Sequence, residues 1–168
     1  MTLLPPPSWH VIYTMPRVEK TVTETIRHLS LETYLPLRLV SRKWTDRIKT
    51  VQAPLFNGYV FVRVSKHERF SLLKIPGVLR FVTFDKQPAI LSEEEILRIR
   101  NFETNGKEIQ PETFLQPGDK VRVVKGIFQD IEGFLIKKLN KTRLMIRMPL
   151  LRQSISVEMP EDYLARIE

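Results

Sequence analysis

The side chains best suited to chemistry are three histidines and a run of glutamates, and their spacing does not assemble a reactive centre. His10, His28 and His67 form no i, i+4 pair, and the chain has no cysteine, so no metal site of the usual spacing is predicted. The acids of "SEEEI" (92–96) instead suit a helix N-terminus, where carboxylates favour the macrodipole. No phosphate-binding or nucleophile motif appears. We therefore expect no enzyme activity, no metal and no cofactor.

A cluster of basic residues indicates an acidic partner. Residues 36–50 hold five basic side chains against one acid, Asp46, and their pattern predicts a hairpin that turns near this residue. Such a hairpin either lies along a phosphate backbone without reading bases or is simply solvated. Trp44 at its tip either stacks on a base or pins the hairpin to the domain, and we favour pinning. The five basic residues are Arg38, Arg42, Lys43, Arg47 and Lys49.

A strand with two apolar faces is the second feature that indicates a partner. In "APLFNGYVFVRV" (53–64), three valines alternate with Tyr59 and Phe61, whereas an ordinary half-buried strand has one polar face. The second face is covered either by another part of the chain or by a protein partner, and the residues alone favour the first. The rings that could line an apolar hollow there are Tyr13, Phe56, Tyr59 and Phe84.

The elements that position these groups fall into two unequal pieces. The net charge is +8 over 168 residues; residues 1–105 hold 16 basic and 10 acidic side chains, and residues 106–168 hold 11 and 9. The first piece therefore carries most of the positive charge. Its pattern predicts strands at 9–15, 35–55 (the hairpin), 53–64 and 77–84, and a helix over 18–30. Two capping boxes, Ser65/Glu68 and Ser92/Glu95, predict two more helices.

The second piece is predicted to contain strands alone. Residues 101–120 are rich in proline, glycine and polar side chains, which indicates a linker. Alternating residues then predict strands at 119–126, 132–139, 143–148 and 153–159, and closely spaced strands of this kind are typical of a small closed barrel. Neither a signal peptide nor a run of about 18 apolar residues is present, so we expect a cytoplasmic monomer with no membrane segment.

Four blocks of this sequence resemble the NusG family of transcription elongation factors. They are "WHVIYT", "PLFNGYVFVRV", "IPGVLRFVTF" and "PGDKVRVVKGIFQDIEGFL", and their order and spacing match the family from about residue 9 onward. Within the family, "PLF-x-x-Y-x-FV" (54–62) and "PAI" (88–90) are similar to the specialised, operon-restricted RfaH-like paralogues. The last block resembles the KOW motif through Gly118, Asp119, Val121, Val123, Gly126, Phe128 and Gly133.

The resemblance implies an α+β protein of two domains. Residues 1–104 would form an NGN domain, a ferredoxin-like open α/β sandwich with an antiparallel sheet. Residues 105–116 would be the linker, and residues 117–168 an SH3-like KOW barrel. In the RfaH-like paralogues the last segment can instead be a helical hairpin that masks the polymerase site. Pro149, Pro160 and the alternating strands favour the barrel here.

The resemblance also implies a function without chemistry. The factor would bind the clamp helices of the largest RNA polymerase subunit and hold the clamp closed. It would thereby suppress pausing and premature termination, on particular long operons. It would be associated with the nucleoid through the transcribing polymerase. The implied polymerase-binding residues are Tyr13, Phe56, Tyr59 and Phe84. Residues expected to touch upstream or non-template DNA are Arg17, Lys20, Arg27, Arg42, Lys43, Arg47 and Arg69. The KOW domain would contact a small ribosomal subunit protein or a termination factor.

Two departures from the family pattern and two rival functions remain. Asn57 replaces the usual proline before Gly-Tyr, and Asp130 stands where glycine is common, although aspartate also tolerates a tight turn.

The first rival function is that of a ribosomal or RNA-binding protein with a KOW domain. It predicts basic charge after residue 106, which is opposite to the observed distribution. The second is an enzyme on a ferredoxin-like domain, which predicts a convergent titratable pocket.

Overall fold

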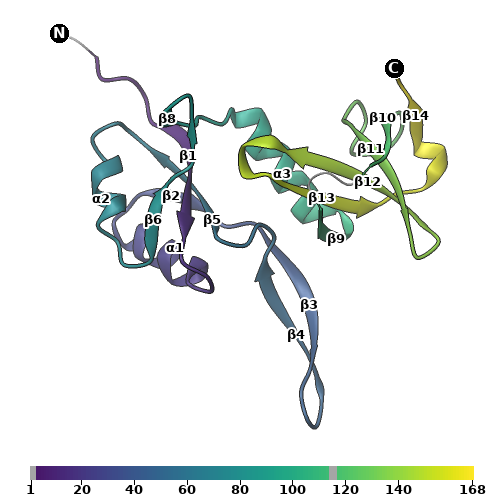
Figure 1. Cartoon of the computed structure of the whole chain (residues 1–168), viewed down its shortest axis with the longest axis horizontal. Coiled ribbons are helices and arrows are strands. Elements are labelled where there is room, and N and C mark those ends of the chain that lie inside the picture. Colours follow the sequence, from purple (N-terminus) through teal and green to yellow (C-terminus); the bar gives the residue numbers. More distant parts are fainter. Residues whose placement is uncertain (1–2, 114–116) are drawn as a thin grey trace. The chain divides into compact units, whose positions relative to one another are not determined.

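The computed structural model describes residues 3–113 and 117–168, which divide into two compact units (Figure 1). The first unit is Met1–Ile99 and the second is Arg100–Glu168. Helix α3 (Glu93–Asn105) begins in the first unit and ends in the second. Residues 114–116, which belong to the predicted linker, lie outside the described residues.

The N-terminal unit is built on a four-stranded antiparallel sheet with the order β2-β5-β1-β6. Along the chain the sheet and its helices run β-α-β-β-α-β, which is the predicted ferredoxin-like arrangement. The strands are β1 (Ser8–Thr14), β2 (Glu32–Tyr34), β5 (Tyr59–Val64) and β6 (Val78–Phe81), and the helices are α1 (Glu19–His28) and α2 (Arg69–Leu73).

Two hairpins and a capped helix complete this unit. A long hairpin, β3 (Leu37–Lys43) and β4 (Ile48–Pro54), is inserted between β2 and β5 and projects from the unit (Figure 1). A short one joins β7 (Thr83–Phe84) to β8 (Gln87–Pro88). Helix α3 then starts at the predicted capping box: the Ser92 amide donates to the Glu95 carboxylate at 2.7 Å, and the Glu95 amide donates to Ser92 Oγ at 3.1 Å.

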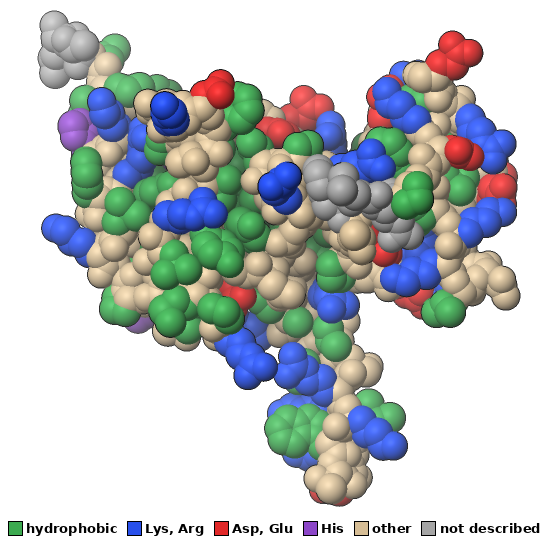
Figure 2. All heavy atoms as spheres, viewed as in Figure 1, with side chains coloured by type: hydrophobic (Ala, Val, Ile, Leu, Met, Phe, Trp, Pro, Cys, Tyr) green, Lys and Arg blue, Asp and Glu red, His purple; other side chains and the backbone are tan. Residues whose placement is uncertain are grey.

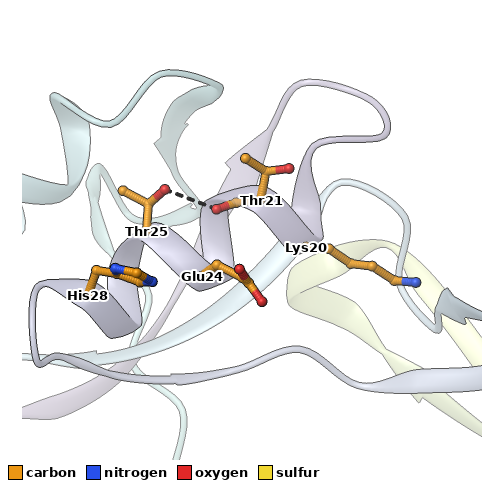
Figure 3. A pocket seen from close by; sticks show the side chains of 5 residues that line it. All are labelled: Lys20, Thr21, Glu24, Thr25 and His28. Atoms are coloured by element: carbon orange, nitrogen blue, oxygen red, sulfur yellow. Dashed lines mark hydrogen bonds between the residues drawn. The ribbon is translucent and has the colours of Figure 1, made fainter.

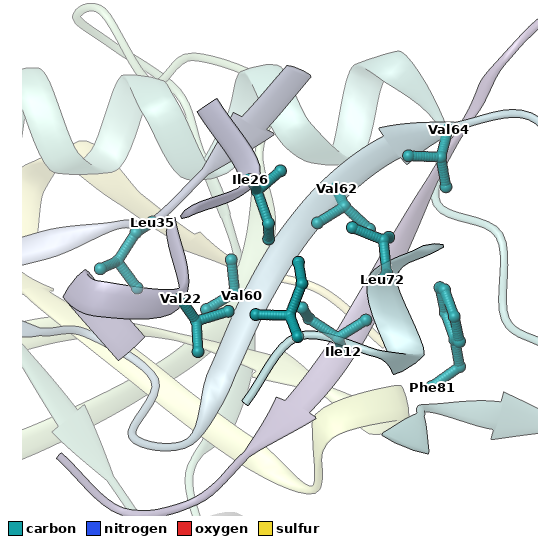
Figure 4. Close-up of a cluster of buried hydrophobic side chains, with 10 residues drawn as sticks. Ile12, Val22, Ile26, Leu35, Val60, Val62, Val64, Leu72 and Phe81 are labelled. Atoms are coloured by element: carbon teal, nitrogen blue, oxygen red, sulfur yellow. The ribbon is translucent and has the colours of Figure 1, made fainter. Parts of the chain in front are cut away.

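The core of the unit lies between one sheet face and helices α1 and α2 (Figure 4). The alternation of β5 directs its three valines into this core, as the sequence predicted, and the stripe of α1 adds Val22 and Ile26. Burial of this face holds α1, since its β-branched residues give it a weak intrinsic helix propensity. The buried cluster comprises Ile12, Val22, Ile26, Leu35, Val60, Val62, Val64, Leu72, Ile75 and Phe81.

His10 of β1 couples the stability of this unit to pH. Its ring is buried, packs edge-on to Phe81 and lies with Nδ1 2.9 Å from the Ala89 carbonyl oxygen. Burial lowers the pKa of His10 below its ordinary value of 6.5, and the positive charge of Arg69 lowers it further. The unfolded chain therefore binds this proton more readily. Stability is complete above about pH 6.5 and is lost as the pH falls from there toward the lowered folded-state pKa.

When the pH is lowered from 7.5 to 5.5, we expect the urea midpoint of the N-terminal unit to decrease. The decrease should be larger in the wild type than in His10→Gln. The slope for one proton is at most about 1.4 kcal/mol per pH unit. The exposed His28 provides the matched control, because His28→Gln should retain the wild-type pH dependence. Identical pH profiles for the wild type and His10→Gln would show that His10 does not carry the effect.

The C-terminal unit is a six-stranded antiparallel sheet with the order β14-β10-β11-β12-β13-β9. Short 3-10 helices at Pro149–Leu151 and Glu161–Tyr163 interrupt it. The four predicted strands form, and Asp130 occupies its turn with φ at +71°. This β-rich unit agrees with the predicted fold class, and β14 and β9 are the outer strands in its pairing order. The strands are β9 (Lys107–Glu112), β10 (Asp119–Val123), β11 (Glu132–Lys138), β12 (Lys141–Met148), β13 (Gln153–Glu158) and β14 (Leu164–Arg166).

Strand β9 corrects the prediction that residues 105–116 form an irregular linker. Residues 107–112 pair with β13, with Pro111 opposite Ile155. Proline cannot donate to a ladder, but an edge strand has one side without partners, so proline is tolerated there. The left-handed backbone of Glu108 and a register shift in β13 accommodate the irregularity of this segment.

A buried arginine fastens β9 to the sheet. Arg143 of β12 is 2% exposed; its Nε donates to Ser156 Oγ at 2.8 Å and its Nη2 donates to the Glu108 carbonyl. Its Nε lies 3.9 Å from the carboxylate of Glu112, which is also buried. Burial works to raise the pKa of Glu112, but hydrogen bonds from Ser156, Gln110 and Lys138 hold it below its ordinary value.

Candidate functional site

A pair of tyrosines lies at the end of the sheet, opposite the helices. Tyr13 of β1 and Tyr59 of β5 are direct cross-strand partners, and their ring centroids are 5.3 Å apart. Both side chains are half-buried. The guanidinium of Arg80, from β6, lies 5.3 Å from the Tyr13 ring centroid and makes a cation–π contact. Two of the four predicted polymerase-binding rings are thus brought together on a partly exposed surface, which we call the tyrosine pair.

Phe56 does not line this surface. Its ring is 1% exposed and packs edge-on against Phe61, with ring centroids 6.1 Å apart. Phe61 in turn is fully buried and also meets Tyr34 at 6.1 Å. We expected Phe56 to form part of an exposed apolar hollow, and its burial corrects this. The centre of the second sheet face is therefore covered by other residues of the chain and not left for a partner. Of the two alternatives, this is the one that the residues alone favoured.

Phe84 is exposed but lies apart from the tyrosines. It is 65% exposed on β7, two residues beyond Val82, whose amide donates to the Val11 carbonyl at 2.8 Å. Tyr13 pairs with Arg80 instead, so Phe84 lies toward the opposite end of β1. Among the described residues, no ring contact joins Phe84 to either tyrosine. The four predicted rings therefore do not form one continuous surface.

Gly58 and Glu19 fix the position of the tyrosine pair. Gly58 has φ at +84°, and a Cβ atom added there would lie 3.0 Å from Tyr13 Cε2, so both the backbone and the packing favour glycine. Its amide donates to the buried carboxylate of Glu19 at 2.9 Å. The Thr14 amide donates to the Gly58 carbonyl at 2.8 Å. The turn before β5 is thus tied to both β1 and α1.

Three of the predicted DNA-binding residues line one groove beside this pair. The groove has a volume of about 790 Å³ and runs between the start of α1 and the β3–β4 hairpin. Arg17, Lys20 and Arg42 all line it, and Lys20 Nζ crosses to the hairpin and donates to the Gln52 carbonyl at 2.6 Å. Trp44 also lines the groove and is 55% exposed, which contradicts the prediction that it pins the hairpin to the domain.

The other predicted DNA-binding residues are dispersed. Lys43 and Arg47 are exposed in the hairpin, along which Lys and Arg side chains gather in Figure 2, but neither lines the groove. Arg27 is exposed in the last turn of α1. Arg69 is half-buried on α2 beside His10, and its Nε has no hydrogen-bond partner among the described residues. Arg69 therefore does not belong to the same surface as Arg17 and Arg42.

A second hollow lies on the outer face of α1 (Figure 3). Lys20, Thr21, Glu24, Thr25 and His28 line it, and Thr25 Oγ1 donates to the Thr21 carbonyl at 3.0 Å. All five side chains come from one helix, so no opposing wall encloses a ligand, and we assign no site there. Within residues 3–113 and 117–168, no three His, Asp or Glu side chains cluster to hold a metal, and no helix has the length and apolarity of a membrane span.

Sequence reasoning missed two residues that shape this region. Arg80 contacts the Tyr13 ring, and Glu19 holds the Gly58 amide. The signal for Arg80 was its place in an otherwise apolar strand, "VLRF". Glu19 carried no usable signal, because an acid in the first turn of a helix is ordinary.

Comparison with known proteins identifies what the N-terminal unit is similar to. The family model described as "Transcription termination factor nusG" matches residues 7–100, which is more than half of the chain. A "Transcription termination/antitermination protein NusG" of Pseudomonas aeruginosa is 27% identical over 166 residues, covering 90% of this chain and 93% of that protein. The protein of the same name in Helicobacter pylori is 29% identical over 134 residues, covering 71% and 75%.

Among solved structures, the chain is similar in fold to one described as "Domain interaction in Thermotoga maritima NusG". The TM-score is 0.63 and the sequence identity is 20%, and the match covers 96% of this chain and 98% of the other. At this identity the likeness concerns the fold, which for the whole chain is the predicted α+β class.

Proposed function

Because the chain belongs to the NusG family of transcription termination and antitermination factors, we propose that it binds RNA polymerase through the tyrosine pair and acts during elongation. The family consists of transcription factors and not of enzymes. The proposed contact is with the clamp helices of the largest polymerase subunit, and the proposed effect is suppression of pausing and premature termination. The observation that carries this proposal is the half-buried pair Tyr13–Tyr59, which lies within the residues that match the family.

The proposed mechanism is a shift of populations in the polymerase. A factor that binds the closed-clamp state more tightly than the paused state moves the equilibrium by its difference in affinity and performs no chemistry. Two aromatic rings held rigidly across adjacent strands suit such binding, since a few aromatic anchors dominate most protein interfaces. The Arg80 contact and the Gly58 turn hold Tyr13 in place before binding, which reduces the entropy lost on docking.

We further propose roles for the hairpin and for the C-terminal unit. The hairpin would lie along upstream or non-template DNA through its basic side chains, a contact that weakens with salt. The C-terminal unit, which carries the KOW-like residues, would contact a small ribosomal subunit protein or a termination factor. The preference for particular long operons rests on the resemblance of residues 54–62 and 88–90 to the specialised paralogues.

The test of this function is the double variant Tyr13→Ala/Tyr59→Ala in a pull-down with core RNA polymerase. Loss of one dominant interface ring costs about 2 kcal/mol or more, or about thirtyfold in affinity, so loss of both should abolish co-purification. A pause assay on purified elongation complexes should show a matching loss of pause suppression. Tyr163→Ala, in the C-terminal unit, is the control for removal of a tyrosine. Wild-type co-purification by a folded double variant would refute the proposal.

A further inference from the structure

The first two residues of α1 hold the two ends of one short segment. The carboxylate of Glu19 accepts the Gly58 amide at 2.9 Å, and Nζ of its neighbour Lys20 donates to the Gln52 carbonyl at 2.6 Å. Gln52 belongs to β4 of the projecting hairpin, whereas Gly58 immediately precedes β5, the strand that begins with Tyr59. One turn of helix therefore contacts the hairpin through one side chain and the turn beside the tyrosine pair through the next.

This first turn of α1 is itself firmly placed. Val18, which precedes it, packs against the core, and a Cβ atom added at Gly77 would lie 2.9 Å from its side chain. Glu19 is buried, and its carbonyl accepts Thr23 Oγ1 at 2.7 Å. Because consecutive helical residues have fixed backbone angles, the Glu19 and Lys20 side chains start from positions that cannot shift independently.

The hairpin is restrained at its base and has few restraints beyond it. Leu55 is buried, and its amide donates to the Pro36 carbonyl at 2.8 Å, which closes the base. Beyond the base the hairpin projects as two strands alone (Figure 1), and a two-stranded sheet is only marginally stable by itself. Among the described residues, the ion pairs of the N-terminal unit lie outside these strands. The hydrogen bond from Lys20 to the β4 backbone therefore restrains the direction in which the hairpin points.

The Gly58 turn, at the other end of the segment, positions both tyrosines. The Gly58 carbonyl accepts the Thr14 amide at 2.8 Å, and the Tyr59 amide donates to the Phe56 carbonyl at 3.2 Å. The ring of Tyr13 packs so closely on Gly58 that an added Cβ atom would lie 3.0 Å from Cε2. A shift of this turn would therefore move both rings.

We propose that Glu19 and Lys20 are positioning residues that couple the direction of the hairpin to the placement of the tyrosine pair. A ligand that orders the hairpin also orders the Gly58 turn, so less conformational entropy is lost when a second ligand binds at the tyrosines. Such coupling is reciprocal, so each ligand strengthens the binding of the other by the same factor. The proposal rests on the proposed function for the identity of the two ligands, which are polymerase at the tyrosine pair and DNA along the hairpin.

The coupling can be measured in the free full-length chain by residue-resolved amide hydrogen exchange. Lys20→Met removes the donor to Gln52 and should speed exchange in β3 and β4 by about fivefold, the effect of one net hydrogen bond. It should also speed exchange of the Tyr59 amide, which is bonded to the Phe56 carbonyl and not to Lys20. Glu19→Ala should in turn speed exchange in the hairpin strands. The effect of each variant at the far end is the decisive result.

Conservative variants separate positioning from charge and from folding. Lys20→Arg keeps a long side chain with donors, and Glu19→Gln keeps an acceptor oxygen, so each should restore wild-type exchange at both ends. Arg17→Met removes an exposed positive charge nearby and should leave exchange unchanged. Lys20 is exposed, so its replacement leaves the fold intact, and the test stands on it even if Glu19→Ala unfolds the unit.

Trp44 at the hairpin tip reports the direction of the hairpin independently. It is 55% exposed, whereas Trp9, the other tryptophan, is 2% exposed and follows the motion of the core. Time-resolved fluorescence anisotropy should show a larger fast component in Lys20→Met than in the wild type. Lys20→Arg should return this component to the wild-type amplitude.

Polymerase provides the measurement with a ligand bound. Core polymerase without nucleic acid should slow exchange in β3 and β4 of the wild type, because order at the tyrosine pair is passed to the hairpin. In Lys20→Met this protection should be lost, and polymerase should bind about fivefold more weakly, the lower end of typical coupling between sites.

The outcomes separate this proposal from the proposed function. The coupling is overturned if each variant loosens only its own end of the segment. It is also overturned if polymerase protects the hairpin equally in the wild type and in Lys20→Met, since a direct contact would then explain the protection. If the far-end effects appear but the wild type does not bind core polymerase, the proposed function fails and the positioning role stands. If polymerase binding depends on the tyrosines but the far-end effects are absent, the proposed function stands without the coupling.

Discussion

Phe56→Ala is expected to destabilise the N-terminal unit by about 3–5 kcal/mol. The ring is 1% exposed and meets Phe61 edge-on, and Leu55 beside it is also fully buried. Its removal leaves a cavity in contact with the strand that carries Tyr59. The Phe56 carbonyl also accepts the Tyr59 amide at 3.2 Å, so loosening here displaces the tyrosine pair. Polymerase binding should fall together with the midpoint of denaturation, and the fluorescence of the buried Trp9 reports that midpoint.

The exposed Phe84 provides the control for this variant. It is 65% exposed, so Phe84→Ala should change the unfolding free energy by less than about 0.5 kcal/mol. The comparison with Tyr13→Ala/Tyr59→Ala is equally informative, because that variant should lose the polymerase while it keeps most of the stability. Phe56→Ala with wild-type stability and reduced polymerase binding would mean that the ring is part of the contact surface after all.

Arg143→Ala is expected to cost the C-terminal unit about 3–5 kcal/mol, since one member of a buried ion pair is removed and the other remains. Glu112 would keep Ser156, Gln110 and Lys138 as donors but would lose the nearby guanidinium charge. The carbonyl of Glu108 would lose its donor as well. Because both glutamates belong to β9, this strand should separate first. Amide hydrogen exchange of β9 and β13 in the full chain measures the effect.

Arg166→Ala is the matched control for the buried arginine. Arg166 donates to Asp119 at 3.1 Å, but both side chains are largely exposed, and exposed ion pairs contribute about 0–1 kcal/mol. The exchange rates of β9 should therefore be nearly unchanged in that variant. If Arg143→Ala leaves β9 as protected as in the wild type, the arginine does not fasten the strand.

The fold was predictable where apolar residues recur at regular spacing over a whole strand or helix, or where a capping box marks the start of a helix. The valines of β5, the stripe of α1 and the Ser92/Glu95 box each specify one local structure, and the structure contains all three. Strand β2 was missed because it is three residues long and ends just before Leu35 and Pro36. Strand β9 was missed because Asn105, Gly106 and Pro111 signal a break. Pairing with β13 and the buried Arg143 overrides that signal, and neither is local in the sequence.

The site was predictable in its residue types and less so in its arrangement. Tyr13 and Tyr59 meet because the register of β1 against β5 places them opposite each other, which the alternation alone does not fix. Phe56 shares their chemistry but precedes the left-handed Gly58, which changes the direction of the chain and leaves the ring inside. Arg17 and Arg42 are 25 positions apart and line one groove, because the hairpin lies beside α1 and Lys20 joins the two.

Strand β9 precedes residue 117 in the sequence but belongs to the sheet of the C-terminal unit, and this determines where a fragment of that unit should begin. A fragment that begins at residue 117 would lack the outermost strand, so the backbone donors and acceptors along one side of β13 would face solvent and recruit a second copy. The same cut would remove Glu108 and Glu112, so Arg143 would lose the carbonyl that accepts its hydrogen bond and the carboxylate beside it. Chimeras that transplant the C-terminal unit should therefore be joined upstream of Lys107, or their insolubility will be mistaken for a property of the barrel.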